Sequence, residues 1–586
     1  MTEEEEKAFL IQYHIREKQN EDSTFVFIMA LIALGLVFSI FHLVRQCTYW
    51  IGKRNGRFKM PSFLATIPRT IRKLSHRRMI GVESLGHATI VTIYLVFNVV
   101  ALFVNNKNSL SKISNIAARS GCLAVANLIF VIFFALKNTP LAFLTAWSYE
   151  RLNCLHRVCG YAALVHTVIH GSCYSYYFLH DGRPEILLRP SDIMGIVAGG
   201  SWVLLGLSAI FVRRWWYELF YYLHILLWLV SIVALGFHQP IFAEKWVIGT
   251  IIAGSMWGLD RLIRFVRLVL YAVNNSATLT PLPNGGTRVI LAKPPLTATP
   301  GKHAFLWIPH IRLVQTHPFT IVSADPMEFV IASQDGFTGA LHKYAVANPG
   351  ACLKASIEGS YGTVPDPSVF ETAVLVAGGS GASFIFGLAQ ALSQKMTRTK
   401  VMTRKVVFVW VVKHRDQLEW FSDHLSTLGN DSLFSIEIFV TRSRPQTPTL
   451  PPVEADVVGD KDDEKAMIRG DVAPDGSNVP ETYTSKSQSS VDLEKSQKSL
   501  GRSDSESTLA GDAGHSMDLK NMVVRYQRPN VAELIRQAVG NTAAHERILV
   551  SGCGPTKLMD VMRETTADCI RSDGPSIELH CESFGW

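Results

Sequence analysis

Residues 156–170 read HRVCGYAALVHTVIH and residues 224–238 read HILLWLVSIVALGFH, so a histidine stands at both ends of each apolar segment. In an α-helix, fourteen residues rise about 21 Å and fall about 40° short of whole turns. Each segment therefore presents two imidazoles on nearly one face, one toward each side of a hydrocarbon core about 30 Å thick. Two such helices side by side form two stacked imidazole pairs. Two neutral imidazoles can serve as the two axial ligands of a haem iron.

A histidine buried in a membrane can also serve as a packing or hydrogen-bonding residue. Ionisable groups inside a membrane are costly and indicate functional sites, and the repeated spacing favours the ligand interpretation. His166 lies about 80° round the helix from His156, so we interpret it as a polar packing residue. His87 and His180 lie near predicted membrane boundaries, where interfacial roles are expected. The predicted ligands of two haems are the four spaced histidines, His156, His170, His224 and His238.

The composition is that of a membrane protein joined to a soluble part. The chain has 586 residues, of which 48% are hydrophobic, and a formal net charge of +8. Apolar residues are concentrated before about residue 270, and basic residues gather beside apolar spans instead of forming one patch, which argues against nucleic-acid binding. The nine cysteines include no CxxC pair, so neither a disulfide framework nor a structural metal site is predicted.

Seven apolar segments predict a membrane domain over residues 24–270, preceded by an outer or lumenal N-terminus at residues 1–23. That N-terminus is acidic at Glu3 to Glu6 and lacks a basic leader, so a cleaved signal peptide is not expected. Ten Lys and Arg residues lie from Arg45, at the end of the first span, to Arg78 in the loop that follows, and the positive-inside rule places this loop in the cytosol. The predicted spans are residues 24–45, 87–104, 120–136, 156–178, 193–212, 217–238 and 246–266.

This topology places everything after residue 270 in the cytosol. His156 and His224 then face the cytosol, whereas His170 and His238 face the outside or a lumen.

From about residue 275 the sequence has the pattern of a soluble α/β protein. Residues 369–586 alternate apolar strands with helices, which is typical of a parallel sheet. Residues 443–517 are rich in Ser, Asp, Glu, Lys and Pro and nearly free of aromatic residues, so a disordered insertion is predicted there. A small antiparallel barrel is predicted over residues 275–368 from three alternating segments, Thr287–Leu291, Ala304–Ile308 and Phe329–Ala332.

Two glycine-rich turns follow apolar strands, one at Gly378–Ser383 and one at Cys553-Gly554-Pro555. Missing side chains let a pyrophosphate approach the backbone, and the N-terminus of the next helix favours its charge. One such turn alone also fits a tight strand–helix connection, but two at the carboxyl ends of one sheet are typical of a dinucleotide site. Thr441, Arg442 and Arg444 end a third strand, where a guanidinium could bind an adenosine 2′-phosphate and favour NADPH over NADH.

Several short motifs together resemble the ferric reductase/NADPH oxidase superfamily, most of all its fungal ferric-chelate reductases. The resemblance covers about residues 115–586 apart from the insertion. Each motif is weak alone, but their order along the chain is specific. The motifs are Arg119-Ser120-Gly121, Ser148–Arg157, Arg213–Phe220 before His224, His317–Thr320, Gly336–Thr338, Glu358–Gly362, Gly378–Ser383, Cys553–Pro555 and Glu582–Trp586.

The resemblance implies a polytopic helical domain with two haems b, fused to a ferredoxin-reductase-like FAD-binding barrel and an α/β NADPH-binding domain. It pairs His156 with His224 at the inner haem, and His170 with His238 at the outer haem. The implied FAD-binding residues are His317, Pro318, Phe319, Thr320, Gly336, Phe337, Thr338, Phe584 and Trp586. The implied NADPH-binding residues are Gly378, Gly379, Ser380, Gly381, Ala382, Ser383, Thr441, Arg442, Arg528, Cys553, Gly554 and Pro555.

The resemblance also implies a reaction at the plasma membrane. Electrons would pass from NADPH through FAD and two haems to ferric or cupric chelates outside, with no catalytic acid, base or nucleophile. Membrane lipid and an iron permease or oxidase of an uptake system are the implied partners. The alternatives are an oxidase that reduces O₂ to superoxide and a non-enzymatic membrane scaffold. The equal spacing of both histidine pairs favours the reductase, because such oxidases often shorten the second spacing by one residue.

Two positions depart from the family pattern, and the outer loops suggest a substrate surface. Ala332 stands where many relatives have a basic residue that reaches the flavin phosphates, and Ser360 replaces a frequent proline. The predicted outer loops are too short to form a thick cap over the outer haem. Their charges predict a surface that mildly attracts anionic ferric chelates, with Lys107, Lys112, Arg119, Arg183 and Arg189 against Asp181, Glu185, Asp192 and Glu244.

Overall fold

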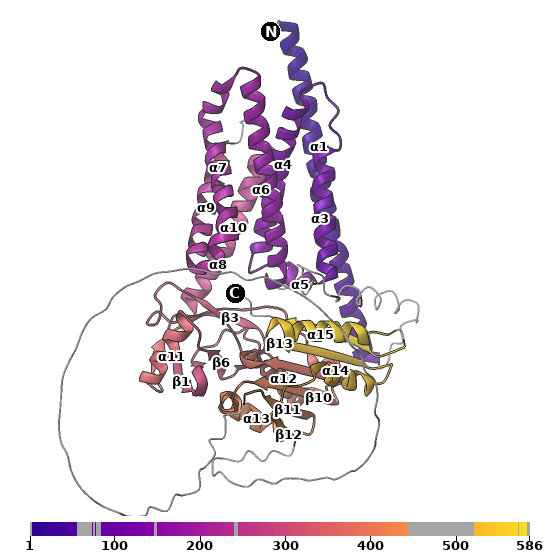
Figure 1. The fold of residues 1–586 in the computed structure, drawn as a ribbon, viewed down its shortest axis with the longest axis vertical. Coiled ribbons are helices and arrows are strands. Elements are labelled where there is room, and N and C mark those ends of the chain that lie inside the picture. The colour runs from indigo at the N-terminus through magenta and orange to yellow at the C-terminus, as the bar shows by residue number, and fades with distance from the viewer. Residues whose placement is uncertain are drawn as a thin grey trace, which may run out of the picture. The chain divides into compact units, whose positions relative to one another are not determined.

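The computed structural model describes residues 3–55, 73, 77, 84–145, 149–238, 244–442, 521–571 and 573–582. Figure 1 shows the helices of the N-terminal half and the strands and helices that follow them along the chain. The predicted insertion, Arg444, Phe584 and Trp586 lie outside the described residues, as does most of the basic loop between the first two predicted spans.

Each of the seven predicted spans coincides with a helix of the structure. Five helical segments among the described residues are long and apolar enough to cross a membrane, namely Glu3–Val44, Leu85–Phe103, Lys112–Ala135, Pro190–Trp215 and Tyr217–His238. The helices at 156–178 and 246–266 are not among them, so the seven-span topology stays a prediction. The helices are α1 (Glu3–Asn55), α3 (Leu85–Phe103), α4 (Lys112–Ala135), α5 (Leu141–Thr145), α6 (Tyr149–His180), α7 (Pro190–Leu207), α8 (Arg213–Trp215), α9 (Tyr217–His238) and α10 (Glu244–Leu270).

Two close helix pairs position the histidine segments. Helix α4 packs along α6, and α7 packs along α9. Small residues at these interfaces permit the close approach, because they let the helix backbones come into contact. Ala126 and Ala163 are almost fully buried in the helical core beside Leu123 and Trp228. The carbonyl groups of α4 and α7 therefore come within reach of side chains on α6 and α9.

Arg119 lies inside the helical domain, so the prediction that it contributes to an outer charged surface was wrong. Its side chain is 0% exposed. A guanidinium has five N–H groups, and buried polar groups of this kind need hydrogen-bond acceptors. Arg119 makes five hydrogen bonds of 2.7–3.2 Å, to oxygen atoms of Asn20, Ala101, Val104, Gln19 and Asn105.

The region predicted to form a small antiparallel barrel contains two antiparallel sheets. One sheet has the strand order β5-β6-β2-β1-β7 and the other the order β4-β3-β8. Alternating apolar residues such as Leu279, Val289 and Phe329 are fully buried between them. The strands are β1 (Ser276–Leu282), β2 (Gly286–Leu291), β3 (His303–Trp307), β4 (His317–Thr320), β5 (Ser323–Ala324), β6 (Met327–Ala332), β7 (Cys352–Lys354) and β8 (Ser356–Tyr361), with helix α11 (Phe337–Ala347) after β6.

The last part of the chain is the predicted parallel α/β domain. Its six-stranded sheet has the order β12-β11-β10-β9-β13-β14, and every neighbouring pair is parallel. Continuous apolar strands such as β9 are buried on both faces, as expected for a parallel sheet covered by helices. The strands are β9 (Thr372–Gly378), β10 (Lys405–Val412), β11 (Phe434–Val440), β12 (Met522–Arg525), β13 (Arg547–Cys553) and β14 (Ser576–Glu582), and the helices are α12 (Ala382–Arg398), α13 (Ser422–Gly429), α14 (Val531–Gly540) and α15 (Thr556–Cys569).

Candidate functional site

The structure brings the four spaced histidines together as two facing pairs. The ring centres of His156 on α6 and His224 on α9 lie 6.2 Å apart, and those of His170 and His238 lie 5.9 Å apart. Two imidazoles that bind one metal ion through nitrogen at about 2 Å place their ring centres about 6 Å apart. Both pairs therefore have the separation that an axially ligated haem iron requires.

Backbone carbonyl groups fix three of the four imidazoles. His156 Nδ1 lies 2.9 Å from the carbonyl oxygen of Val131, and His238 Nδ1 lies 2.9 Å from that of Ser191. His170 Nδ1 makes a hydrogen bond of the same length with a carbonyl of α4. When Nδ1–H donates to a carbonyl, Nε2 keeps its lone pair for a metal, and the ring orientation is fixed. The three rings are therefore held in the tautomer that a haem ligand needs.

Two glycines make room for the outer pair. A Cβ atom at Gly121 would lie 2.6 Å from His170 Nδ1, and one at Gly195 would lie 2.5 Å from His238 Nδ1. Any other residue would push the imidazole away, so both positions need glycine for steric reasons. Gly121 belongs to the Arg119-Ser120-Gly121 motif, whereas Gly195 lies in no motif found in the sequence. The sequence signal for this role was a glycine inside a predicted span. That signal does not identify the helix whose histidine packs against the glycine.

His166 does not belong to either pair. It is 5% exposed, and its Nε2 lies 3.2 Å from Asn98 Oδ1. Asn127 donates to the same oxygen at 2.7 Å, and Tyr94 donates to Asn127. This buried polar cluster agrees with the interpretation of His166 as a packing residue. His87, near a predicted boundary, contacts the Ser84 hydroxyl.

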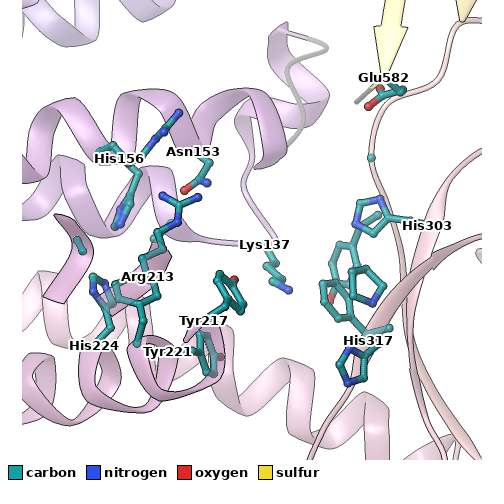
Figure 2. A pocket seen from close by; sticks show the side chains of 18 of the residues that line it. Lys137, Asn153, His156, Arg213, Tyr217, Tyr221, His224, His303, His317 and Glu582 are labelled. Atoms are coloured by element: carbon teal, nitrogen blue, oxygen red, sulfur yellow. The ribbon is translucent and has the colours of Figure 1, made fainter. Parts of the chain in front are cut away.

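A cavity of about 1600 Å³ runs from the inner histidine pair to the soluble domains. Figure 2 shows His156 and His224 on one side of this cavity and His303, His317 and Glu582 on the other. Lys137 lies between the two groups in this view. The outer pair does not line the cavity. A single cavity thus adjoins one of the two histidine pairs and the segments predicted to bind the flavin and the nicotinamide nucleotide.

Six of the predicted flavin-binding residues line this cavity: His317, Pro318, Phe319, Thr320, Phe337 and Thr338. His317 to Thr320 form strand β4, and the ring centre of His317 lies 4.5 Å from that of Phe337 in a stacked arrangement. Burial lowers the pKa of His317, an effect opposed by the charge of Glu218 and reinforced by that of Arg312. Gly336 has φ 73°, which favours glycine, and Thr338 Oγ1 accepts a hydrogen bond of 2.9 Å from the backbone of Gln334. This turn presents backbone and hydroxyl groups of the kind that bind phosphate.

The two glycine-rich turns meet at the carboxyl ends of β9 and β13. A Cβ at Gly381 would lie 2.4 Å from the carbonyl oxygen of Cys553, and one at Gly378 would lie 2.7 Å from Pro555. The turn after β9 leads directly into α12, and its Ser380 lines the cavity. The two turns therefore lie side by side, as predicted. Gly379 lies between Gly378 and Gly381 in the first turn, and Gly554 lies between Cys553 and Pro555 in the second.

Some of the predicted nucleotide-binding side chains are used for packing. Ala382 is 0% exposed, and Ser383 Oγ donates to the carbonyl oxygen of Val330 in the neighbouring barrel. The Cys553 side chain is buried in the hydrophobic core, and this burial raises the pKa of its thiol. These residues shape the turn, and a nucleotide there would contact backbone atoms.

The side chains that could distinguish NADPH from NADH lie at the same sheet edge. Thr441 Oγ1 donates to the carbonyl oxygen of Val412 at 3.0 Å, which fixes the end of β11. Arg442 follows it with an exposed side chain, and Arg528 is exposed on the loop before α14. Both guanidinium groups are thus exposed at the carboxyl ends of neighbouring strands, β11 and β12.

Comparison with known proteins agrees with this arrangement. Residues 120–235 match the family "Ferric reductase like transmembrane component", residues 272–381 match the FAD-binding domain, and residues 370–567 match the "Ferric reductase NAD binding domain". The chain is thus similar to the ferric reductase superfamily in its membrane, FAD-binding and nucleotide-binding parts.

Three curated members of this superfamily illustrate the relationship. The chain is 24% identical to a ferric/cupric reductase transmembrane component of Saccharomyces cerevisiae, which it matches over 84% of its own length and 65% of the relative. A second ferric reductase transmembrane component of that yeast is 26% identical over 86% of the chain and 67% of the relative. A probable cell surface ferric reductase of Aspergillus oryzae is 27% identical over 59% of the chain and 50% of the relative. The chain thus spans between half and about two thirds of these relatives.

Several residues that line the cavity were not predicted from the sequence. Lys302 precedes β3 beside the predicted flavin strand, and burial lowers the pKa of its ammonium group. Ala332 also lines the cavity, at the position where the family often has a basic residue. Lys302 and Ala332 thus line the same cavity, and of the two only Lys302 is basic. Its signal was weak, because a lysine before a strand is common.

Proposed function

We propose that this chain is an NADPH-dependent reductase of ferric chelates, with cupric chelates as a second substrate class. The observation that carries the proposal is the combination of two imidazole pairs at iron-binding separation with a cavity that joins the inner pair to the flavin and nucleotide segments. The balanced reaction is NADPH plus two ferric ions giving NADP⁺, two ferrous ions and one proton.

The residues divide this task between them. FAD converts a hydride into single electrons, and haem iron carries these one at a time when the cofactors are bound. His156 with His224 and His170 with His238 would each hold one haem b. The β4 strand and the turn at Gly336 would hold FAD, and the turns at Gly378 and Gly554 would hold the nucleotide. No side chain near these segments is required as an acid, base or nucleophile.

The cavity also supports the proposed orientation in the membrane. The inner pair shares a cavity with the soluble domains, whereas the outer pair lies about 21 Å along the same helices. The soluble domains would lie in the cytosol, and the outer pair would deliver electrons to an acceptor outside the plasma membrane. An iron permease or oxidase is proposed as a partner in uptake, with lipid around the helices.

The first test is the cofactor content and acceptor of the purified protein. The proposal predicts two low-spin b-type haems and one FAD per chain, and reduction of a ferric chelate by NADPH in the absence of oxygen. Superoxide dismutase should leave that activity unchanged. Loss of ferric reduction without oxygen, or its removal by the dismutase, would instead support an oxidase that forms superoxide.

A further inference from the structure

A buried ion pair joins the end of α10 to the flavin barrel. Arg264 Nε lies 2.6 Å from Glu358 Oε1, and an Arg264 terminal nitrogen lies 2.9 Å from Glu358 Oε2. The two side chains are only 12% and 3% exposed. Glu358 is part of strand β8 and belongs to the Glu358–Gly362 motif, to which the proposed function assigns no role. The pair is bidentate, so it fixes both the distance and the orientation of the two segments.

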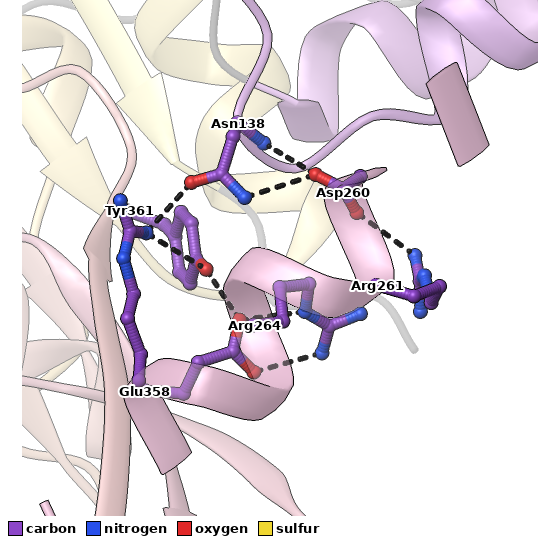
Figure 3. A network of polar contacts seen from close by, with 7 residues as sticks. Asn138, Asp260, Arg261, Arg264, Glu358 and Tyr361 are labelled. Atoms are coloured by element: carbon purple, nitrogen blue, oxygen red, sulfur yellow. Dashed lines mark hydrogen bonds and ion pairs between the residues drawn. The ribbon is translucent and has the colours of Figure 1, made fainter. Parts of the chain in front are cut away.

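The same network reaches the segment that follows α4. The Tyr361 hydroxyl donates to Glu358, and Arg267 donates to Tyr361 at 3.4 Å and to Asn138 Oδ1 at 2.6 Å. Asn138 in turn donates from its backbone and side-chain nitrogens to Asp260 of α10, at 3.1 and 2.9 Å. Figure 3 shows these contacts as a continuous path. We call these six residues the docking network: Asn138, Asp260, Arg264, Arg267, Glu358 and Tyr361.

The docking network connects the segments that would carry the inner haem and the flavin. Val131 of α4 accepts the hydrogen bond of His156, seven residues before Asn138. Phe305 of β3 pairs with Glu358 in the flavin barrel, and Lys137 Nζ lies 3.2 Å from the centre of its ring. Lys137, Arg264, Phe305 and Tyr361 all line the cavity that also contains His156.

Buried ion pairs of this kind contribute more to geometry than to stability. Desolvation of both charges offsets most of their attraction, whereas any displacement leaves a buried charge without a partner. Electron transfer between two centres, like other reactions, depends steeply on their relative position. We propose, on the basis of the proposed function, that Arg264 and Glu358 are positioning residues that hold the flavin barrel against the inner histidine pair and so set the rate of flavin-to-haem electron transfer.

The test measures two rates in the purified full-length protein with its cofactors. Glu358→Gln and Arg264→Gln should each lower the rate at which NADPH reduces the haems by at least about tenfold. The rate at which NADPH reduces a soluble dye should stay within about twofold, because that path needs only the flavin. Exchange of the charges in Glu358→Arg with Arg264→Glu should restore part of the haem reduction rate.

The control is Arg404→Gln, which breaks an exposed ion pair of 3.2 Å with Glu546 in the nucleotide domain and should change neither rate. If the glutamine variants do not fold, Tyr361→Phe removes one hydroxyl of the docking network and should slow haem reduction alone. Normal haem reduction in these variants, or equal loss of dye and haem reduction, would overturn the inference. A wild-type protein without b-type haem absorption would overturn the proposed function and this inference with it.

Discussion

Gly195 leaves room for the imidazole of His238, and its replacement by alanine tests the outer ligand pair. A Cβ at this position would lie 2.5 Å from both Cε1 and Nδ1 of His238, where ordinary contact begins at 3.4 Å. The ring would have to recede by about 0.9 Å, whereas metal–ligand distances tolerate changes of only about 0.2 Å. Gly195→Ala is therefore expected to detach His238 from iron and to lower the haem content from about two per chain to about one.

The assay is the ratio of haem to protein after purification, with the flavin content as a check on folding. Gly200→Ala on the same helix is the matched control, because its Cβ would meet nothing within 4 Å. Alanine stabilises a helix interior relative to glycine by about 1 kcal/mol, so loss of haem in Gly195→Ala cannot come from helix propensity. Two haems with unchanged low-spin spectra in Gly195→Ala would refute the ligand role of His238.

Three further predictions concern single side chains. His170→Ala should remove the outer haem and abolish ferric reduction while dye reduction continues, whereas His166→Ala should retain both haems. The measurements are the haem-to-protein ratio and the rates of ferric and dye reduction. Normal haem content in His170→Ala would contradict the assignment of His170 as a ligand. Arg442→Ala should raise the KM for NADPH markedly and leave that for NADH nearly unchanged in steady-state kinetics, whereas an equal effect on both nucleotides would mean that Arg442 supports the fold. Because burial raises the pKa of the Cys553 thiol, an alkylating reagent at neutral pH should modify exposed Cys352 and spare Cys553 in peptide mass spectrometry, and rapid labelling of Cys553 would show that the turn opens.

Local patterns in the sequence were sufficient to predict the elements of the fold. Runs of apolar residues located the helices, and alternation located strands such as β2 and β6, because each signal depends on neighbouring residues. The repeated spacing also predicted which histidines share a helix face. Pairing of α6 with α9 follows from the same spacing, since only two helices carry it. Helices α6 and α10 contain many polar and charged residues, so apolarity alone does not establish that they span the membrane.

Contacts between distant segments could not be predicted in this way. The carbonyl of Ser191 that fixes His238 and the space left by Gly195 depend on how α7 packs along α9. Arg119 was expected at an outer surface, but it is buried against acceptors from the end of α3 and from α1, where Asn20 lies 99 positions away in the sequence. The Arg264–Glu358 pair joins residues 94 positions apart. Hydropathy and motif spacing contain no information on such pairings.

The most direct test of the central claim is electron transfer across a sealed membrane. The full-length protein would be reconstituted with its cofactors in vesicles, with a membrane-impermeant ferric chelate inside and NADPH added outside without oxygen. Only molecules whose soluble domains face outward can use the nucleotide. We expect ferrous iron inside the vesicles at two ions per NADPH consumed, and none when His170 is replaced by alanine. NADPH oxidation without internal ferrous iron, or equal iron reduction by His170→Ala, would contradict it.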